Sequence, residues 1–280
     1  MTDIILDCDP GHDDAIALLL ALASPELNLL GVTTVSGNQT LEKTTANAIR
    51  VLDHVGREAV TVAAGADRPL VRERHVAAEV HGETGLDGPD LPPPSRPPAR
   101  EHAIDWIART LVSHDRLVTL VPTGPLTNIA LLLARYPELA PRIERIVLMG
   151  GAFGEGNVTP AAEFNIWGDP EAAHRVFSTD VDLTMVGLDV THQALLTPDH
   201  LEVLERAGAP GKLIADLYRF FLSIHGERYG WVGAPVHDAV AVAHVIDGSL
   251  LQTTRCAVAI DTGGELSRGR TNADVRRQTD

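Results

Sequence analysis

Four carboxylates are crowded into one turn between an apolar strand and an apolar helix near the start of the chain. The strand is predicted over residues 4–8 and the buried helix over 14–23, and the acidic residues of this junction are Asp7, Asp9, Asp13 and Asp14. Carboxylates at such close spacing repel one another, and removing them from water costs free energy. An ordinary helix cap accounts for one or two of them. A divalent cation with oxygen ligands accounts for all four, so the junction predicts a metal site.

Strand-like and helix-like segments alternate along most of the chain. Further strands are predicted over residues 27–35, 60–64, 117–121, 143–149 and 182–187, and further helices over 41–55, 103–113, 126–135 and from 169 onwards. The strands are mainly apolar rather than alternating, which indicates an α/β fold with a mostly parallel sheet and helices on both faces. The part after Pro198 is mainly helical and is expected to form a small C-terminal cap. Sites in such folds lie at the carboxyl ends of strands, where the acidic junction also falls.

The charge of the chain limits its partners. Its 280 residues carry a formal net charge of −15, the pI is near 5.1, and 44% of the residues are hydrophobic. This balance disfavours nucleic-acid backbones and anionic membranes, and it suits a neutral or cationic small molecule. No linker demands a second domain, so one domain over residues 1–280 is expected.

Cysteine usage indicates a reducing compartment. The chain has two cysteines, Cys8 within the first predicted strand and Cys256, and they form no disulfide framework. Asp3 comes too early for a signal peptide, and the apolar run at residues 15–23 is too short to span a bilayer. A cytoplasmic protein is therefore expected.

The segment at residues 68–100 breaks the alternation. It contains Pro69 and a proline cluster from Pro89 to Pro98, lacks clear periodicity, and includes His81 next to a glycine-rich stretch. Loops of this length inside a compact domain are uncommon and tend to be functional. The segment is predicted to form a loop over the active site, and a plain surface insertion is the alternative.

A second acid-headed apolar helix is predicted within residues 234–247. The pair His237 and Asp238 precedes an almost wholly apolar run. A helix N-terminus favours an anion, so a simple cap explains Asp238 when it is taken alone. Two such helix heads in one chain indicate that both acidic ends converge on one cation.

Polar residues follow three more of the predicted strands. Asn38 follows the strand at 27–35, and the prolines around Thr123 leave its carbonyl free to face a ligand. The segment after the strand at 143–149 carries amides and a carboxylate beside aromatic rings: Asn157, Glu163, Asn165, Phe164 and Trp167. Such groups are typical of sugar binding, although an ordinary polar loop has the same composition.

Together these motifs resemble the inosine-uridine preferring nucleoside hydrolases. The first is the N-terminal run Asp7-Cys8-Asp9-Pro10-Gly11-His12-Asp13-Asp14-Ala15. The others match in order and spacing: Ser36-Gly37-Asn38, Pro122-Thr123-Gly124-Pro125-Leu126-Thr127-Asn128, Met149-Gly150-Gly151, Glu163-Phe164-Asn165 and Pro235-Val236-His237-Asp238. The resemblance extends over nearly the whole chain. It implies a calcium-dependent N-ribohydrolase that releases ribose and free base from ribonucleosides, with a Rossmann-like open sheet.

The resemblance also implies roles for the matching residues. The implied calcium ligands are Asp9, Asp14, Asp238 and the carbonyl of Thr123. Asp9 also accepts a proton from the attacking water. The implied ribose-hydroxyl ligands are Asp13, Asn38, Asn157, Glu163, Asn165 and Asp238. Met149 and Phe164 are expected beside the substrate.

Two histidines are expected near the leaving base. His81 comes from the long loop, and His237 is predicted to donate a proton or a hydrogen bond, because histidine exchanges protons near neutral pH. A helix cap or a ribose contact is the alternative for His237. Tyr229 and Trp231 are candidates for the base pocket, with core packing the stronger interpretation for Trp231. The two histidines favour pyrimidine nucleosides or a broad specificity.

Elementary chemistry agrees with this assignment. Calcium lowers the pKa of water only modestly, so a carboxylate base such as Asp9 is needed. Cleavage of an N-glycosidic bond develops positive charge on the sugar, which an acidic pocket stabilises. Two alternatives remain: a haloacid dehalogenase-type phosphatase, since Asp7-x-Asp9 follows the first strand, and a non-catalytic nucleoside-binding protein, which needs no general base.

The C-terminal end departs from the family pattern. Family members usually continue for some tens of residues beyond the position of Asp280, so the last strand and helix of the family fold are expected to be missing or disordered. The resemblance also implies a homo-oligomer, a dimer or a tetramer.

Overall fold

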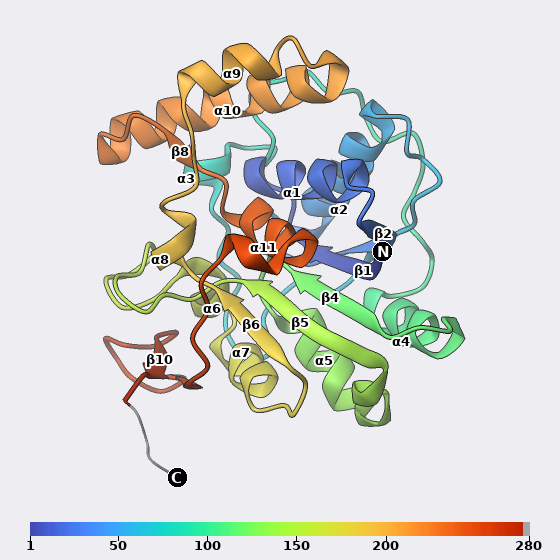
Figure 1. Cartoon of the computed structure of the whole chain (residues 1–280), viewed down its shortest axis with the longest axis vertical. Helices are drawn as coiled ribbons and strands as arrows, with labels where there is room; N and C mark the ends of the chain where they lie inside the picture. Colours follow the sequence, from blue (N-terminus) through green and yellow to red (C-terminus); the bar gives the residue numbers. More distant parts are fainter. Residues whose placement is uncertain (277–280) are drawn as a thin grey trace.

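The centre of the structure is a six-stranded, fully parallel sheet (Figure 1). The structure, a computed structural model, describes residues 1–276, except for the side chains at positions 225 and 227–229. The strand order is β3-β2-β1-β4-β5-β6. The strands are β1 (Thr2–Cys8), β2 (Leu27–Thr34), β3 (Val62–Ala64), β4 (Val118–Pro122), β5 (Ile143–Met149) and β6 (Leu183–Val186). All six predicted strands are present close to their predicted bounds.

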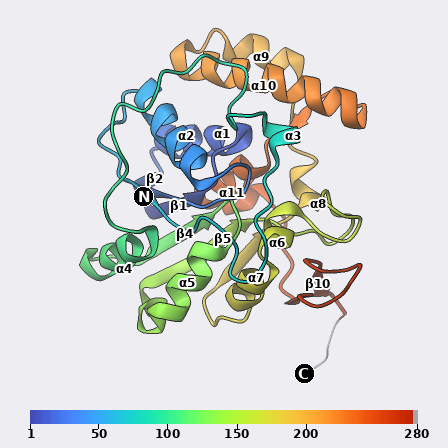
Figure 2. The same ribbon diagram turned by 180° about the vertical axis from the view of Figure 1, so that it is seen from behind.

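Helices cover both faces of this sheet (Figures 1 and 2). One layer consists of α1 (His12–Ala23), α2 (Leu41–His54) and α11 (His237–Ile246), and the other of α4 (Ala103–Ser113), α5 (Thr127–Arg135) and α7 (Pro170–Phe177). Side chains of β1 alternate between the layers, with Ile4 and Leu6 packed in one and Ile5 in the other. Because both faces are buried, the strands need apolar residues at every position. The predicted α/β class is confirmed.

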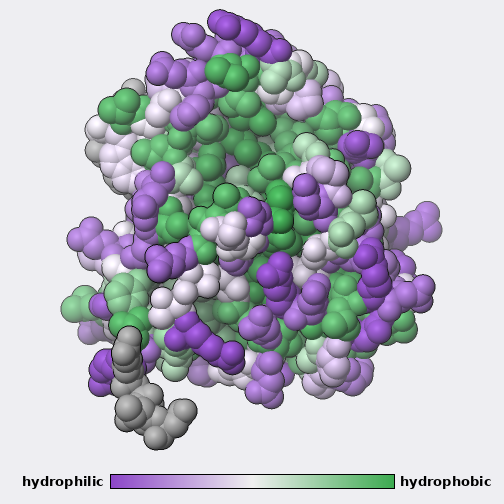
Figure 3. Space-filling view, in the orientation of Figure 1, coloured by the Kyte–Doolittle hydropathy of each residue, from purple (hydrophilic) through white to green (hydrophobic). Residues whose placement is uncertain are grey.

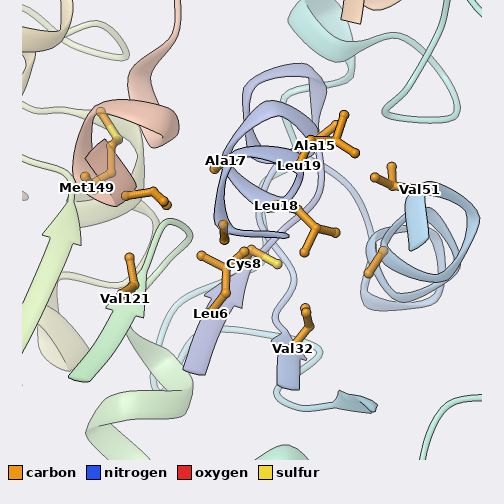
Figure 4. Packing of buried hydrophobic residues seen from close by; sticks show 14 of the residues in the cluster. Leu6, Cys8, Ala15, Ala17, Leu18, Leu19, Val32, Val51, Val121 and Met149 are labelled. Atoms are coloured by element: carbon orange, nitrogen blue, oxygen red, sulfur yellow. The ribbon is translucent and has the colours of Figure 1, made fainter. Parts of the chain in front are cut away.

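Cys8 belongs to the apolar layer under α1 (Figure 4). The side chains of Leu6, Cys8 and Val32 rise from the sheet toward Leu18 of the helix. The Cys8 thiol is fully buried and donates to the carbonyl of Thr33 at 3.7 Å. Cys8 therefore packs as a small apolar residue, as predicted, and it is a free thiol, as is Cys256.

A helical cap follows Pro198, as predicted, and lies above α1 in Figure 1. It consists of α9 (Pro198–Leu204) and α10 (Gly208–Tyr229), with the short strands β7 (Leu195–Leu196) and β8 (Ala234–Pro235) beside it. Tyr218 and Phe221 of α10 pack with Ile16 of α1. The Tyr218 hydroxyl donates to the carbonyl of Pro235 at 2.7 Å, which ties the cap to the start of α11.

The remaining elements are short. They are α3 (Ala78–His81), α6 (Phe164–Gly168), α8 (Leu188–Thr191), two 3₁₀ turns, η1 (Pro137–Arg142) and η2 (Gly248–Leu250), and the antiparallel strands β9 (Ala257–Ile260) and β10 (Thr271–Asp274). The β9–β10 pair was not predicted, because its two strands have four residues each and β10 contains three polar side chains. None of the described helices combines the length and hydropathy that a bilayer crossing requires.

The segment at residues 68–100, the blue-green trace of Figure 2, runs past the β3 edge of the sheet. The amide of Ala99 donates to the carbonyl of Val62 at 2.7 Å. Ala99 and Ala63 thereby form an isolated parallel β-bridge. Arg50 of α2 donates to the carbonyl of Pro92 at 3.0 Å. The segment thus covers the edge of the sheet, and its one helical turn, α3, buries His81.

Asn128 at the start of α5 is a structural link that a stability measurement can test. Its amide donates to the buried Asp7 carboxylate at 2.8 Å and to the carbonyl of Thr34 at 3.0 Å, and it accepts from the amide of Ala66 at 2.8 Å. Asn128→Ala removes these three hydrogen bonds. The Asp7 carboxylate keeps the hydroxyl of Thr33 and the Thr34 carbonyl keeps the amide of Gly65, so at about 1 kcal/mol for each bond the free energy of unfolding should fall by about 3 kcal/mol. Denaturant titration measures this value.

The matched control for Asn128→Ala is Asn28→Ala. The amide of Asn28 donates to one carboxylate, Asp3, at 2.6 Å, and Asp3 keeps Arg116 as a partner at 2.6 Å. Loss of the Asn28–Asp3 hydrogen bond should lower the free energy of unfolding by less than about 1 kcal/mol. Equal losses in the two variants would contradict the structural role of Asn128.

Candidate active site

The carboxyl ends of four neighbouring strands meet at one edge of the sheet and carry predicted site residues. Asp9 follows β1, Asn38 follows β2, Thr123 follows β4, and Met149 ends β5. The N-termini of α1 and α11 lie at the same edge, because the carboxylates of Asp13 and Asp14 in the first turn of α1 lie beside that of Asp238 in the first turn of α11. The two acid-headed helices therefore converge, as their sequences indicated.

Asp14 lies in the first turn of α1 and is held by four donors. One oxygen accepts from the hydroxyl of Thr123 at 2.9 Å and the amide of Asp9 at 3.3 Å. The other accepts from the amide of Gly11 at 3.0 Å and the side chain of Asn38 at 3.1 Å. Donors from three strand ends thus fix this carboxylate.

Asp9 is fully buried and only half satisfied. Its Oδ2 accepts from the amide of Asn38 at 2.5 Å, whereas its buried Oδ1 has no hydrogen-bond partner among the described residues. Gly37 and Gly124 stand against it, and an added Cβ would lie 2.0 Å and 2.5 Å from its carboxylate oxygens. Burial and the charge of Asp14 raise the pKa of Asp9 well above its ordinary value. Asp9 Oδ1 is therefore a hydrogen-bond acceptor in a low-dielectric environment.

Asp13, Asp14 and Asp238 form a compact carboxylate group. One oxygen of each lies within 4.8 Å of the others, and all three side chains are buried. Burial and the charges of Asp13 and Asp14 raise the pKa of Asp238 well above its ordinary value, and burial and Asp14 raise the pKa of Asp13 to about 7. Such repulsion is relieved either by shared protons or by a cation.

The donor set fits a hard divalent cation. It offers carboxylate oxygens, and one of them, Asp13 Oδ1, is buried with no partner among the described residues. Asp9 lies near enough for its charge to raise the pKa of Asp238. The carbonyl of Thr123, the fourth predicted ligand, accepts from the side chain of Asn165 at 2.7 Å. A carbonyl has two lone pairs, so this bond leaves it able to bind a cation.

The residues predicted to bind the ribose, and the two expected beside the substrate, share one cavity of about 620 Å³. They are Asp13, Asn38, Met149, Asn157, Glu163, Phe164, Asn165 and Asp238, and all of them line this cavity. The volume is within the usual range for small-molecule sites.

Glu163 is more constrained than the sequence suggested. Its carboxylate caps α6 and accepts from the amides of Gly151 at 2.8 Å, Asn165 at 2.9 Å and Ile166 at 3.1 Å. Burial raises the pKa of Glu163 to about 7, although these amides oppose the shift. Asn157 accepts from the amide of Phe164 at 2.9 Å. Both side chains are thus oriented by the backbone of the loop that they belong to.

Part of the cavity lining consists of rings (the wall of rings), and the two predicted histidines are among them. His81 Nδ1 accepts from the backbone amide of His12 at 3.3 Å, and His237 Nδ1 lies 2.7 Å from the hydroxyl of Thr191. Phe221 and His192 also line the cavity, and no sequence signal pointed to either, because Phe221 reads as core and His192 lies in an ordinary loop. Trp231, weighed mainly as a core residue, lines the cavity as well. The predicted role of Tyr229 concerns a side chain outside the described residues.

Fold and site together define a class of protein. An open parallel α/β sheet gathers carboxylates and amides around a small-molecule cavity at its carboxyl edge, with a buried acid group that could hold a metal ion and with rings in the cavity lining.

The chain matches the sequence profile of the inosine-uridine preferring nucleoside hydrolases over residues 4–280 and belongs to that family. It is a ribonucleoside hydrolase, which cleaves the N-glycosidic bond and releases ribose and free base. The predicted resemblance is confirmed. The two alternatives, a phosphatase and a non-catalytic binding protein, are set aside.

Relatives match the chain over almost its whole length. The pyrimidine-specific ribonucleoside hydrolase RihA of Shewanella sp. (strain MR-4) is 54% identical over 273 residues, which are 97% of this chain and 86% of the relative. The protein of the same name from Photobacterium profundum is 51% identical over 279 residues, 99% of this chain and 90% of the relative.

Two solved structures share the fold. The plant nucleoside hydrolase PpNRh1 superposes with a TM-score of 0.92 at 35% identity and covers 100% of this chain and 90% of its own. The purine-preferring ribonucleoside hydrolase from Gardnerella vaginalis superposes with a TM-score of 0.93 at 36% identity. The match covers 99% of this chain and 89% of that structure's chain.

The packing of Gly37 against Asp9 generates a prediction. A methyl group at position 37 would lie 2.0 Å from Asp9 Oδ2, so Gly37→Ala must displace this carboxylate. We expect turnover to fall at least about a hundredfold, as it should for Asp9→Asn, because misplacing a catalytic group is that costly. Steady-state hydrolysis of uridine measures the loss.

Gly168→Ala is the matched control for Gly37→Ala. Its new methyl group would meet only Pro125, at 3.5 Å, which is ordinary contact. It should keep turnover close to that of the unsubstituted chain. Normal turnover in Gly37→Ala would show that the position of Asp9 does not limit the reaction.

Proposed function

We propose that this ribonucleoside hydrolase uses calcium and prefers pyrimidine ribonucleosides. The observation that carries the proposal is the buried, oxygen-only donor set of Asp13, Asp14 and Asp238, of which Asp13 and Asp238 line the cavity. Calcium prefers carboxylate and carbonyl oxygens, six to eight of them. An all-oxygen site without histidine or cysteine is unlike a zinc site.

Asp9, Asp14, Asp238 and the carbonyl of Thr123 are the proposed calcium ligands. When it is bound, the cation neutralises the clustered carboxylates and makes a nearby water more acidic. Asp13 and Asp238 both belong to the carboxylate group and line the cavity, so they link the proposed cation site to the sugar.

Asp9 acts as the general base in this proposal. Its Oδ2 is occupied by the amide of Asn38, and its unpartnered Oδ1 is the atom that receives a proton from the attacking water. Burial raises the pKa of Asp9, which makes it a stronger base than an exposed aspartate. The charge of the cation is what keeps it deprotonated at neutral pH.

The ribose is held on the wall formed by Asn38, Asn157, Glu163 and Asn165. Hydrogen bonds to its hydroxyls position the anomeric carbon toward Asp9, and binding energy at these remote groups lowers the barrier. Positive charge that develops on the sugar is stabilised by the acidic surroundings, including Asp13.

The leaving base is placed against the wall of rings. His237 supplies a proton or a hydrogen bond to it, and His81 is the second imidazole near it. The pyrimidine preference rests on two observations: relatives named pyrimidine-specific are 51–54% identical, whereas the structure named purine-preferring is 36% identical. Tyr229 remains a predicted contact of the base.

The assembly and location of the protein are part of the same proposal. We take residues 1–280 as one domain with the segment at 68–100 over the site. Exposed apolar side chains such as Val203, Val232 and Leu250 support a homo-oligomer, and Figure 3 shows apolar residues gathered on the upper half of one face, near α10 and α11. The free thiols Cys8 and Cys256 support the cytoplasm as its location.

Hydrolysis assays test the proposed function directly. The protein should cleave uridine with a kcat/KM at least about tenfold above that for inosine, a difference of about 1.4 kcal/mol in transition-state binding. Chelation should abolish turnover, and calcium should restore it. p-Nitrophenyl phosphate serves as a negative control. Full activity after exhaustive chelation, or a preference for inosine, would contradict the corresponding half of the proposal.

The raised carboxylate pKa values predict how calcium and pH act together on stability. Without calcium, folding raises the pKa of Asp13 and of Glu163 to about 7, so the folded chain holds protons that the unfolded chain releases. Its free energy of unfolding should therefore fall as pH rises from about 4 to about 7. Calcium needs deprotonated carboxylates, so its stabilisation should grow across the same window.

Thermal unfolding with chelator or with calcium checks this dependence. The rise in Tm on adding calcium should be clearly larger at about pH 7.5 than at about pH 5. An equal rise at both pH values would mean that calcium does not bind at the buried carboxylates.

A further inference from the structure

The imidazole of His237 has a buried partner outside the predicted site. His237 is the first residue of α11, and its Nδ1 lies 2.7 Å from the hydroxyl of Thr191. Thr191 is fully buried at the end of α8 and, unlike His237, does not line the cavity. Two residues 46 positions apart in sequence are thus joined by a short hydrogen bond directly behind the wall of rings.

The residue after Thr191 holds the same imidazole from another side. The ring of His192 meets that of His237 edge-on, with centroids 5.5 Å apart, and meets that of Trp231 at 5.1 Å. Burial lowers the pKa of His192, so this ring contacts its neighbours as a neutral imidazole. The end of α8 therefore supplies a hydrogen bond and a ring contact to one side chain.

We propose that Thr191 is a positioning residue of the reaction. Its hydroxyl fixes the rotation of the His237 ring, and with it the direction in which the second ring nitrogen, Nε2, meets the leaving base. The inference rests on the proposed role of His237 at the leaving base. It adds a residue that no motif of the sequence pointed to, since Thr191 lies between two ordinary segments.

The physical reason is the freedom of a histidine side chain. Rotation about the outer side-chain bond of histidine is broad and roughly two-fold, so packing alone defines the ring flip poorly. A hydrogen bond to one nitrogen selects one flip and presents the other nitrogen to the substrate.

Isosteric substitution tests the proposal. Thr191→Val keeps the shape and removes the hydroxyl, whereas Thr191→Ser keeps the hydroxyl. For uridine we expect Thr191→Val to lower kcat about tenfold to a hundredfold with little change in KM, and Thr191→Ser to restore most of it. For p-nitrophenyl riboside, whose leaving group needs no proton, Thr191→Val should lower kcat by less than about threefold.

Two further variants make the result decisive. Thr197→Val is the matched control, because Thr197 also pairs with a histidine, His200 at 3.1 Å, on the exposed side of α9, so both substrates should turn over normally. The double variant Thr191→Val/His237→Ala should lose no more activity on uridine than His237→Ala alone, since residues that act as one unit are not additive. Thr191→Ala repeats the test if Thr191→Val fails to fold.

Each outcome decides a separate point. Equal losses of Thr191→Val on uridine and p-nitrophenyl riboside, or additive losses in the double variant, would overturn the positioning role of Thr191. If His237→Ala lowers the turnover of uridine and of p-nitrophenyl riboside equally, the proposed role of His237 is overturned. The positioning role of Thr191 is then overturned as well. Calcium affinity, measured by titration with calcium alone, should be unchanged in Thr191→Val.

Discussion

The burial of several carboxylates at one edge of a parallel sheet is the constraint on which the rest of the structure depends. Asp9, Asp13, Asp14 and Asp238 are all buried, and burial raises the pKa of each one. Amide donors and helix N-termini offset part of this cost, most completely at Asp14. The remainder requires protons or a cation, so the arrangement that completes the fold also creates a group able to hold a cation.

Much of this arrangement could be predicted from the sequence, because it follows from local patterns. Mainly apolar strands indicate a parallel sheet with two covered faces, and parallel strands bring their carboxyl ends to one edge. Asp9, Asn38 and Thr123 follow three different strands, so their proximity follows from topology alone. Asp238 was reached in the same way, as the head of a second apolar helix.

The parts that escaped prediction depend on packing between distant segments. Phe221 reaches the cavity from a long helix whose apolar residues all read as core, and His192 and Thr191 come from one short turn. The three amides around Glu163 are fixed by the path of a loop, which no periodicity encodes. Sequence patterns therefore indicated which residues form the site, whereas tertiary contacts determine the orientation of each side chain.

This division also explains how one cavity can favour one nucleoside over another. In the proposed binding mode the carboxylates and amides of the cavity meet the ribose, which every ribonucleoside shares, so they cannot discriminate between bases. Discrimination has to come from the wall of rings, where His81, His237 and Phe221 arrive from three separate elements. A small shift of α3 or α10, or of α8 through the bond between Thr191 and His237, would change the orientation of these rings without moving the carboxylates. Specificity can thus change while the carboxylate group, bound by its charge balance, remains the same.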